Sequence, residues 1–195
     1  RGDRVFLAER SLWPVNPKGA TRLAILAFVN QELGLYYNAV PLYERSLLIR
    51  ESAFGLAYFD LAPSLNSLAN TYYAMGRHAE ALPLYERSLS IQERFFGSDH
   101  PKVATSLSNL AVFHQKMGRR ADALSLHERS LSIRERILGP DHPDVATSLD
   151  NLALLHQEMG RHSNAVPLYD RSFSIRERAF GLAYFDLAPS LNSLA

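Results

Sequence analysis

Apolar residues recur along most of this chain at the three- and four-residue spacing of an amphipathic α-helix. One series comprises Leu107, Leu110 and Ala111, and the next comprises Ala123, Leu124, Leu126, Leu131 and Ile133. Side chains at these spacings lie on one face of a helix. The pattern therefore predicts two helices in this stretch, from about Lys102 to Met117 (helix A) and from about Arg120 to Leu138 (helix B).

The pattern repeats with a constant period. Glycine occurs at Gly34, Gly76, Gly118 and Gly160, and again at Gly55, Gly97, Gly139 and Gly181, so both series have a spacing of 42 residues. The tetrapeptide Glu-Arg-Ser-Leu begins at Glu44, Glu86 and Glu128, and the variant Asp-Arg-Ser-Phe begins at Asp170. A period of this length indicates stacked helical repeats. Glycine readily adopts the left-handed conformation that ends a helix, so each unit is predicted to reverse direction twice.

Histidine and proline mark the helix starts. His100 and His142 each precede a proline, and proline is tolerated in the first helical turn because its missing N–H needs no partner there. Both histidines are therefore interpreted as capping residues. Pro83 and its counterparts fall early in helix B, and they are expected to remove one backbone hydrogen bond without ending the helix.

The composition and charge of the chain exclude several classes of function. The chain has 195 residues, is 47% hydrophobic, and balances 21 basic against 20 acidic residues. Such a balance gives no field that attracts nucleic acid or a membrane surface, so neither is expected as a partner. There is no cysteine and no apolar run of the roughly 20 residues that span a bilayer. We interpret the chain as a soluble, cytoplasmic part of a longer protein.

No motif for catalysis or cofactor binding is present. Phosphate-binding glycine loops, His-Glu-x-x-His and Gly-x-Ser-x-Gly are all missing from the sequence. His114 and His156 are one period apart at a helix-packing position, which favours a structural role over a metal ligand. We expect no enzyme activity, no metal and no cofactor.

The repeated unit resembles a known family. It has small residues at Ala111, Gly118 and Ala123 and a large ring at Tyr85, His127 and Tyr169. In these features, from about residue 20 onward, it is similar to the 42-residue tetratricopeptide repeats of kinesin light chains and nephrocystin-3-like proteins. The resemblance implies an all-α fold, a right-handed superhelical solenoid of antiparallel helix pairs. Ser88, Ser130 and Ser172 stand where the family more often has alanine, and serine is small enough to preserve the close approach of the helices.

The period predicts the domain organisation. It places repeats at residues 18–59, 60–101, 102–143 and 144–185, between a partial repeat with a shortened helix B at 1–17 and a truncated helix A at 186–195. Ala179–Ala195 repeats Ala53–Ala69 without change, 126 residues later. The two partial repeats are complementary, which suggests head-to-tail self-association between copies. The alternative is that they are unpaired ends that only lower solubility.

The resemblance also implies a concave groove lined by the A helices. Its predicted peptide-binding residues are Gln31, Asn66, Asn70, Tyr73, Ser108, Asn109, Gln115, Lys116, Asp150, Asn151 and Gln157, with Phe28 beside them. Amide side chains both donate and accept hydrogen bonds, so they suit the backbone of an extended peptide. Asn109 and Asn151 match an asparagine that contacts peptide backbone in several family members. The alternative is that these side chains face water or bond neighbouring helices.

These observations favour a module that binds a protein or peptide ligand, as the scaffold or sensor part of a larger protein. Because Lys116 is the one lysine on the predicted wall, a clamp for chaperone carboxylate ends is not expected, and the acidic cargo of kinesin light chains fits weakly. The alternative function is a structural element that assembles head to tail through its partial repeats.

Overall fold

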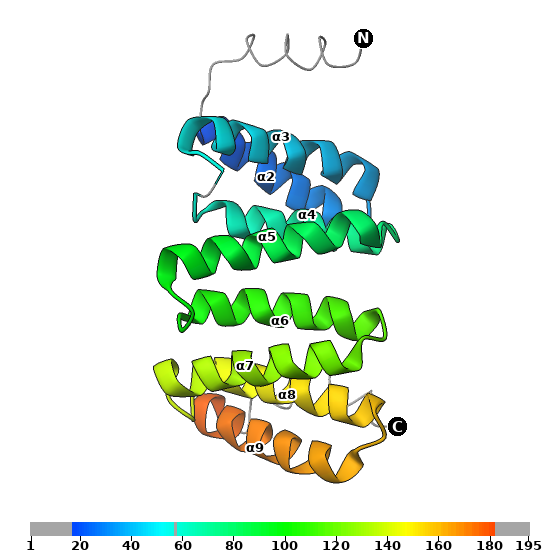
Figure 1. Cartoon of the computed structure of the whole chain (residues 1–195), viewed down its shortest axis with the longest axis vertical. Coiled ribbons are helices and arrows are strands. Elements are labelled where there is room, and N and C mark those ends of the chain that lie inside the picture. The colour runs from blue at the N-terminus through cyan, green and yellow to red at the C-terminus, as the bar shows by residue number, and fades with distance from the viewer. Residues whose placement is uncertain (1–16, 57, 182–195) are drawn as a thin grey trace. The chain divides into compact units, whose positions relative to one another are not determined.

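The computed structural model describes residues 17–56 and 58–181, and every regular element within these ranges is an α-helix (Figure 1). The helices are α2 (Pro17–Glu32), α3 (Tyr36–Phe54), α4 (Leu61–Ala74), α5 (His78–Phe96), α6 (Pro101–Lys116), α7 (Arg120–Leu138), α8 (Pro143–Glu158) and α9 (His162–Phe180). None of them combines the length and apolar character needed to cross a membrane.

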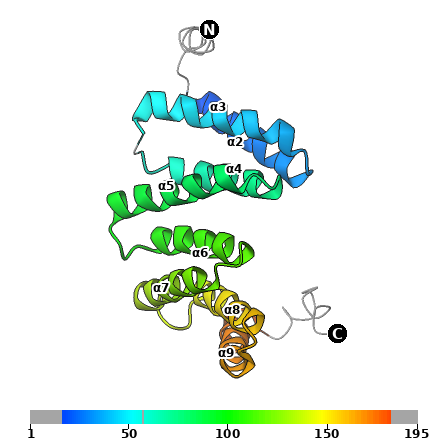
Figure 2. The same cartoon turned by 45° about the vertical axis from the view of Figure 1, so that its right-hand side comes forward.

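The helices form antiparallel pairs, α2 with α3, α4 with α5, α6 with α7 and α8 with α9 (Figures 1 and 2). The chain divides into two compact units. The first extends to Ile91 and holds α2 to α4 and most of α5, and the second begins at Gln92 and holds the end of α5 and α6 to α9. The all-α helical-repeat architecture is therefore confirmed, whereas the handedness of the superhelix stays a prediction.

The helix bounds agree closely with the sequence pattern. α7 coincides with the predicted helix B, and α6 begins and ends one residue before the predicted helix A. The exact repeat boundaries stay a prediction. The partial repeats at 1–17 and 186–195 lie outside the described residues, apart from Pro17, which begins α2.

The two kinds of chain reversal both use glycine in the left-handed region. Gly118, between α6 and α7, has φ +75°, and Gly139, after α7, has φ +89°. The backbone N–H of Arg119 donates to the carbonyl of His114 at 2.9 Å, so a carbonyl of the last turn of α6 is satisfied. A side chain at either glycine is strained whatever space surrounds it, which explains why the glycines mark the period.

Histidine caps two of the A helices, as predicted. The Nδ1 atom of His100 accepts from the backbone N–H of Lys102 at 3.1 Å, and His142 accepts from Asp144 at the same distance. Each bond satisfies one of the free N–H groups in the first turn. Proline does not end helix B, since α5 continues unbroken through Pro83.

The serine of the recurring tetrapeptide joins the two helices of each pair. In each case its Oγ donates to an alanine carbonyl of helix A, 26 positions earlier: Ser46 to Ala20 at 2.7 Å, Ser88 to Ala62 at 3.2 Å, Ser130 to Ala104 at 2.8 Å and Ser172 to Ala146 at 3.1 Å. All four serines are buried. Serine thus preserves the close approach, as predicted, and also supplies a hydrogen bond that alanine cannot make.

The arginine of the same tetrapeptide joins successive B helices. It pairs with a glutamate 36 positions earlier: Arg87 with Glu51 at 2.7 Å, Arg129 with Glu93 at 2.7 Å and Arg171 with Glu135 at 2.5 Å. These pairs are partly exposed, so each contributes at most about 1 kcal/mol. Their recurrence nevertheless fixes the register between one B helix and the next.

Replacement of Ser130 tests the serine bond. Ser130→Ala removes its bond to Ala104 and leaves Ser108, whose Oγ lies 2.8 Å from that of Ser130, without this partner. Alanine also has the better helix propensity, so the matched control is Ser132→Ala at an exposed site of the same helix. We expect Ser130→Ala to be less stable than Ser132→Ala by about 1 kcal/mol in urea unfolding. Equal stabilities would show that the bond contributes nothing.

Candidate peptide-binding groove

The first unit contains an open pocket between its two A helices, α2 and α4. Its volume is about 450 Å³. The lining residues are Thr21, Ala24, Ile25, Phe28, Tyr43, Arg50, Asp60, Pro63, Ser64 and Ser67. Phe28, which the sequence analysis placed beside the predicted groove residues, is part of this lining.

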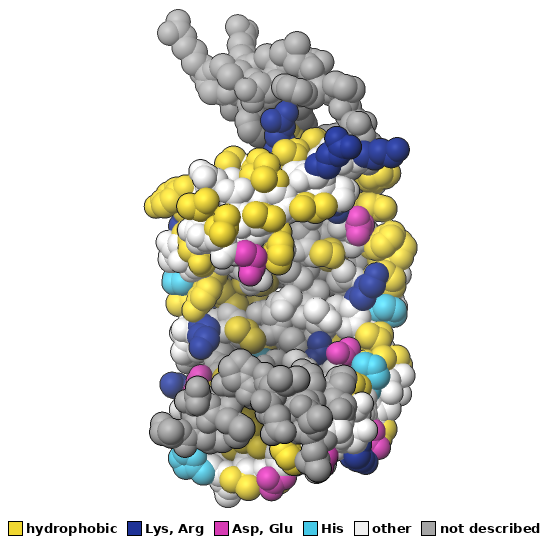
Figure 3. Space-filling model, turned by 180° about the vertical axis from the view of Figure 1, so that it is seen from behind, with side chains coloured by type: hydrophobic (Ala, Val, Ile, Leu, Met, Phe, Trp, Pro, Cys, Tyr) yellow, Lys and Arg dark blue, Asp and Glu magenta, His cyan; other side chains and the backbone are white. Residues whose placement is uncertain are grey.

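The α2 side of this pocket is apolar and accessible. Ile25 is 60% exposed and Phe28 is 52% exposed, although both are large hydrophobic residues. In Figure 3, hydrophobic side chains gather on the upper part of the face on which α2 lies. Clustered exposed apolar side chains are typical of binding surfaces, whereas single ones are ordinary.

The charged side chains at the edge of the pocket form an ion pair with each other. Arg50 Nη1 lies 2.9 Å from the Asp60 carboxylate and also donates to the Asp60 backbone carbonyl at 3.2 Å. Its other terminal nitrogen lies 3.5 Å from Thr21 Oγ1. Since the one arginine of the lining has its own carboxylate, the pocket offers no uncompensated charge to a ligand.

Several residues of the first unit that were predicted to line the groove make hydrogen bonds within the fold instead. Gln31 accepts from the hydroxyls of Tyr43 at 3.1 Å and Thr71 at 2.9 Å. Asn70 is exposed but accepts from the hydroxyl of Tyr85, a helix B residue. These amides are therefore partly explained by internal hydrogen bonding, the alternative weighed from the sequence. Asn66 and Tyr73 are half-buried.

Two predicted residues of the second unit are turned away from the wall. Ser108 is 8% exposed, and its Oγ lies 2.8 Å from that of Ser130 in α7. Gln115 is 7% exposed. The expectation that these two side chains are accessible is wrong, because they fill the space between the helices.

The other predicted residues of the second unit remain accessible to different degrees. Lys116 and Gln157 are exposed, and Asn109 and Asn151 are half-buried. Gln157 accepts from the Tyr169 hydroxyl at 3.2 Å. Asp150, also half-buried, pairs with Arg176 of α9 at 2.5 Å. Whether any of these side chains contacts a ligand stays a prediction.

Most residues on the apolar side of the pocket were not among those predicted from the sequence. Thr21, Ala24 and Ile25 stand 84 positions, or two periods, before Thr105, Ser108 and Asn109. Counting back two periods from the corresponding residues of the second unit gives these three positions. They were overlooked because their chemistry differs from that of the amide-rich units.

One helix B carries histidine where the others carry tyrosine. Tyr43 and Tyr169 each donate to a glutamine 12 positions earlier, and His127 stands at the same spacing from Gln115. Neither ring nitrogen of His127 has a hydrogen-bond partner among the described residues, although the side chain is 1% exposed. Burial, and secondly the nearby charge of Arg134, lowers the pKa of His127 to about 4.

Arg134 is itself a buried cation held by uncharged oxygens. Its Nη1 donates to Ser148 Oγ at 2.6 Å and to the Asp144 carbonyl at 3.2 Å. Burial lowers its pKa from the usual value. The residues 17–56 and 58–181 contain no group of three histidine or acidic side chains placed to hold a metal ion.

A family model of the tetratricopeptide repeat matches residues 20–94, 60–112 and 103–178. The chain belongs to the tetratricopeptide repeat family. Such repeats generally mediate protein–protein interaction. No curated protein sequence matches the chain.

Solved structures share the architecture. BtubC (BKLC) from P. vanneervenii is 23% identical, with a TM-score of 0.76 over 88% of this chain and 69% of that one. A protein of Podosopora anserina assigned as a kinesin light chain, with nearly identical TPR-like repeats, is 28% identical, with a TM-score of 0.71 over 84% of this chain and 77% of that one. MamA shares the fold at 15% identity and a TM-score of 0.59, over 84% of this chain and 82% of that one. This tetratricopeptide repeat chain is thus of the kinesin light chain-like type.

The buried His127 is expected to make the stability of the chain depend on pH. Because the folded chain holds the pKa of His127 at about 4, below the ordinary 6.5, the unfolded chain binds the proton first as pH falls. Protonation of His127 in the unfolded chain therefore lowers the free energy of unfolding as pH falls from about 6.5 to 4. The loss over the whole interval is roughly 3 kcal/mol. We expect His127→Tyr to be about 1 kcal/mol more stable at pH 7, through a hydroxyl bond to Gln115, and the advantage to grow as pH falls to 5.

Thermal unfolding at pH 7 and pH 5 measures this difference. His162→Tyr, at an exposed position of α9, is the matched control and is expected to leave the pH dependence unchanged. A His127→Tyr variant that is less stable than the parent at both pH values would contradict the interpretation.

Proposed function

We propose that this chain is a non-enzymatic module that binds an extended peptide or partner protein in the groove lined by its A helices. The observation that carries the proposal is the open pocket between α2 and α4, with Ile25 and Phe28 accessible at its edge. The module acts as the scaffold or sensor part of a larger protein. We place it in the cytoplasm, with neither nucleic acid nor membrane as a partner.

The chemistry of the pocket favours an apolar side chain of the ligand. Burial of a large aliphatic or aromatic side chain against Ile25 and Phe28 stabilises a complex by up to about 2 kcal/mol. Arg50 is paired with Asp60, so an acidic side chain of the ligand would compete with an existing ion pair. A ligand with a bulky apolar residue therefore fits better than an acidic one.

The amide side chains of the second unit support backbone recognition. Asn109 and Asn151 are half-buried on α6 and α8. Each can donate to a peptide carbonyl and accept from a peptide N–H.

Replacement of the pocket residues tests the proposal. Peptides selected from a displayed random library for binding to the full chain serve as the probe. We expect Ile25→Asp and Phe28→Asp each to weaken their binding about tenfold or more, because a charge replaces the apolar contact. Asn109→Ala and Asn151→Ala are expected to weaken binding by smaller factors. Fluorescence anisotropy with labelled peptides measures each affinity.

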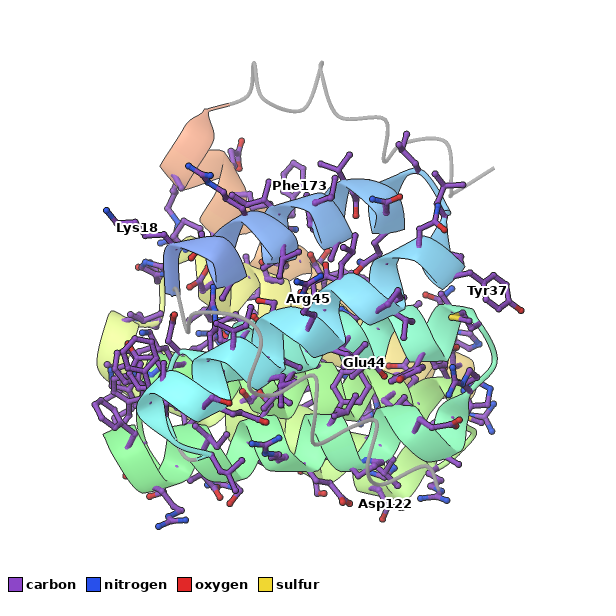
Figure 4. All side chains as sticks on the ribbon, turned by 90° about the horizontal axis from the view of Figure 1, so that it is seen from above. Lys18, Tyr37, Glu44, Arg45, Asp122 and Phe173 are labelled. Atoms are coloured by element: carbon purple, nitrogen blue, oxygen red, sulfur yellow. The ribbon has the colours of Figure 1, made fainter. Side chains whose placement is uncertain are left out.

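Tyr37→Asp is the control for these variants. Tyr37 is exposed, is not part of the pocket lining, and projects outward from the start of α3 (Figure 4). Its replacement is expected to leave the affinity unchanged. Equal affinities for all variants, or a greater loss from Tyr37→Asp, would place binding outside the groove.

We propose head-to-tail self-association as a second candidate function. Leu26 of α2 is half-exposed, whereas its counterparts one and two periods later, Leu68 and Leu110, are buried. This open face of α2 favours stacking of a further helix. The partial repeats that the hypothesis joins lie outside the described residues.

Sedimentation over rising protein concentration tests this candidate. A head-to-tail contact does not close, so the mean mass is expected to grow with concentration, and Leu26→Asp is expected to reduce that growth. The control is again Tyr37→Asp. A mass that stays monomeric throughout would refute self-association and leave groove binding standing.

A further inference from the structure

Each A helix of the second unit carries a row of accessible side chains along one face. On α6 these side chains are spaced four, three and four positions apart, and residues at such spacings lie on one face of a helix. They are Thr105, Asn109, Val112 and Lys116 (the α6 row). Thr105 and Lys116 are exposed, Val112 is 40% exposed and Asn109 is half-buried. The α6 row is therefore open to a ligand along its length.

Helix α8 has the same row one period later. It consists of Thr147, Asn151, Leu154 and Glu158 (the α8 row), with the same pattern of exposure. α6 and α8 contact each other, and equivalent positions of stacked repeats face the same side. The two rows therefore lie beside each other, so that the amides, the apolar side chains and the charged side chains are each matched across the two helices.

The two helices differ mainly in charge. Their sequences differ at five of 16 positions, and three of these differences place an acidic residue on α8 where α6 has a basic or neutral one. The three positions are Lys102 and Asp144, Ser108 and Asp150, and Lys116 and Glu158. α6 therefore has two lysines and no acidic residue, whereas α8 has three acidic residues and no lysine or arginine.

Lys116 and Glu158 are the exposed charges of the two rows. Asp150, by contrast, is half-buried and pairs with Arg176 of α9 at 2.5 Å. Lys116 and Glu158 are the last residues of their helices, where the helix dipole favours a cation and disfavours an anion. Helix stability therefore accounts for Lys116 but not for Glu158, which favours a role for the carboxylate in binding.

We propose that the two rows bind an extended stretch of peptide with an acidic side chain on Lys116 and a basic side chain on Glu158. The inference rests on the proposed groove function and gives the ligand chemistry of the second unit. Packed helices lie roughly 8–10 Å apart, and each residue of an extended chain spans about 3.3–3.6 Å. The acidic and the basic residue of the ligand are therefore two or three positions apart.

The rest of each row suits the same ligand. The side chains of Asn109 and Asn151 can each donate to and accept from the peptide backbone. Val112 and Leu154 offer an apolar surface to a residue between the two charged ones. A ligand with its acidic and basic residues exchanged would meet a like charge at both contacts. The order of the charges in the ligand therefore sets specificity.

Charge reversal tests the inference. Peptides selected from a displayed random library on the full chain serve as the probe, and we expect a class with an acidic and a basic residue at this separation. Its affinity, measured by fluorescence anisotropy at low ionic strength, is expected to fall about tenfold in Lys116→Glu and in Glu158→Lys, because each variant replaces an attraction by a repulsion. Glu128→Lys, at an exposed position of α7, is the control and is expected to leave the affinity unchanged.

The double variant Lys116→Glu/Glu158→Lys separates charge complementarity from damage to the fold. We expect it to bind the selected peptides weakly. Synthetic versions with the acidic and basic residues exchanged are expected to bind it about as tightly as the original peptides bind the parent chain. A double variant that prefers the original peptides, or that binds neither set although its circular dichroism matches that of the parent, would overturn the inference.

The same selection distinguishes failure of this inference from failure of the proposed function. Selected peptides without such a charge pair, or with affinities that neither single reversal changes, would overturn the inference. Groove binding would still stand if Ile25→Asp and Phe28→Asp weaken those peptides. Recovery of no binding peptide would overturn both.

Discussion

A buried hydroxyl that bonds a backbone carbonyl of its partner helix sets the geometry of every repeat. Ser130 illustrates it, since its Oγ reaches the carbonyl of Ala104 at 2.8 Å and both residues are buried. Such a bond needs small side chains on both helices and fixes the rotation of helix B about its own axis. Successive residues of a helix point about 100° apart, so this rotation directs Arg129 toward the preceding B helix and Leu131 toward the following A helix. One tetrapeptide therefore makes three different contacts.

The helical architecture was predictable because its determinants are local. Gly118 and Gly139 end helices in a conformation that only glycine adopts easily, and His100 caps α6 through its own side chain. Apolar spacing supplies the remaining information, and α7 consequently begins and ends where the pattern predicts. Pro83 shows the limit of a single-residue rule, since packing on both sides carries α5 through a residue that disfavours a helix interior.

The groove was only partly predictable because it depends on contacts between helices. Gln31 and Gln115 occupy equivalent positions, yet one accepts from a tyrosine and the other lies buried at the matching spacing from His127. The identity of the partner in helix B decides the difference, and no pattern within helix A reveals it. The apolar side of the pocket was missed for a related reason. Ile25 differs from Asn109 and Asn151, which stand two and three periods later, so the amide pattern did not point to this position.

The pairs between arginine and glutamate bear on how such a chain can change in length. Each pair joins two positions that every full period supplies again, and Arg87 and Glu51 are separated by the same interval as Arg171 and Glu135. Insertion of a single residue between the partners would misalign one pair, whereas duplication of whole periods breaks none. Unequal recombination between near-identical units therefore yields proteins that already fold. The unchanged recurrence of Ala53–Ala69 at Ala179–Ala195 is a sequence record compatible with this route, in which the number of units varies freely while the length of each is held constant.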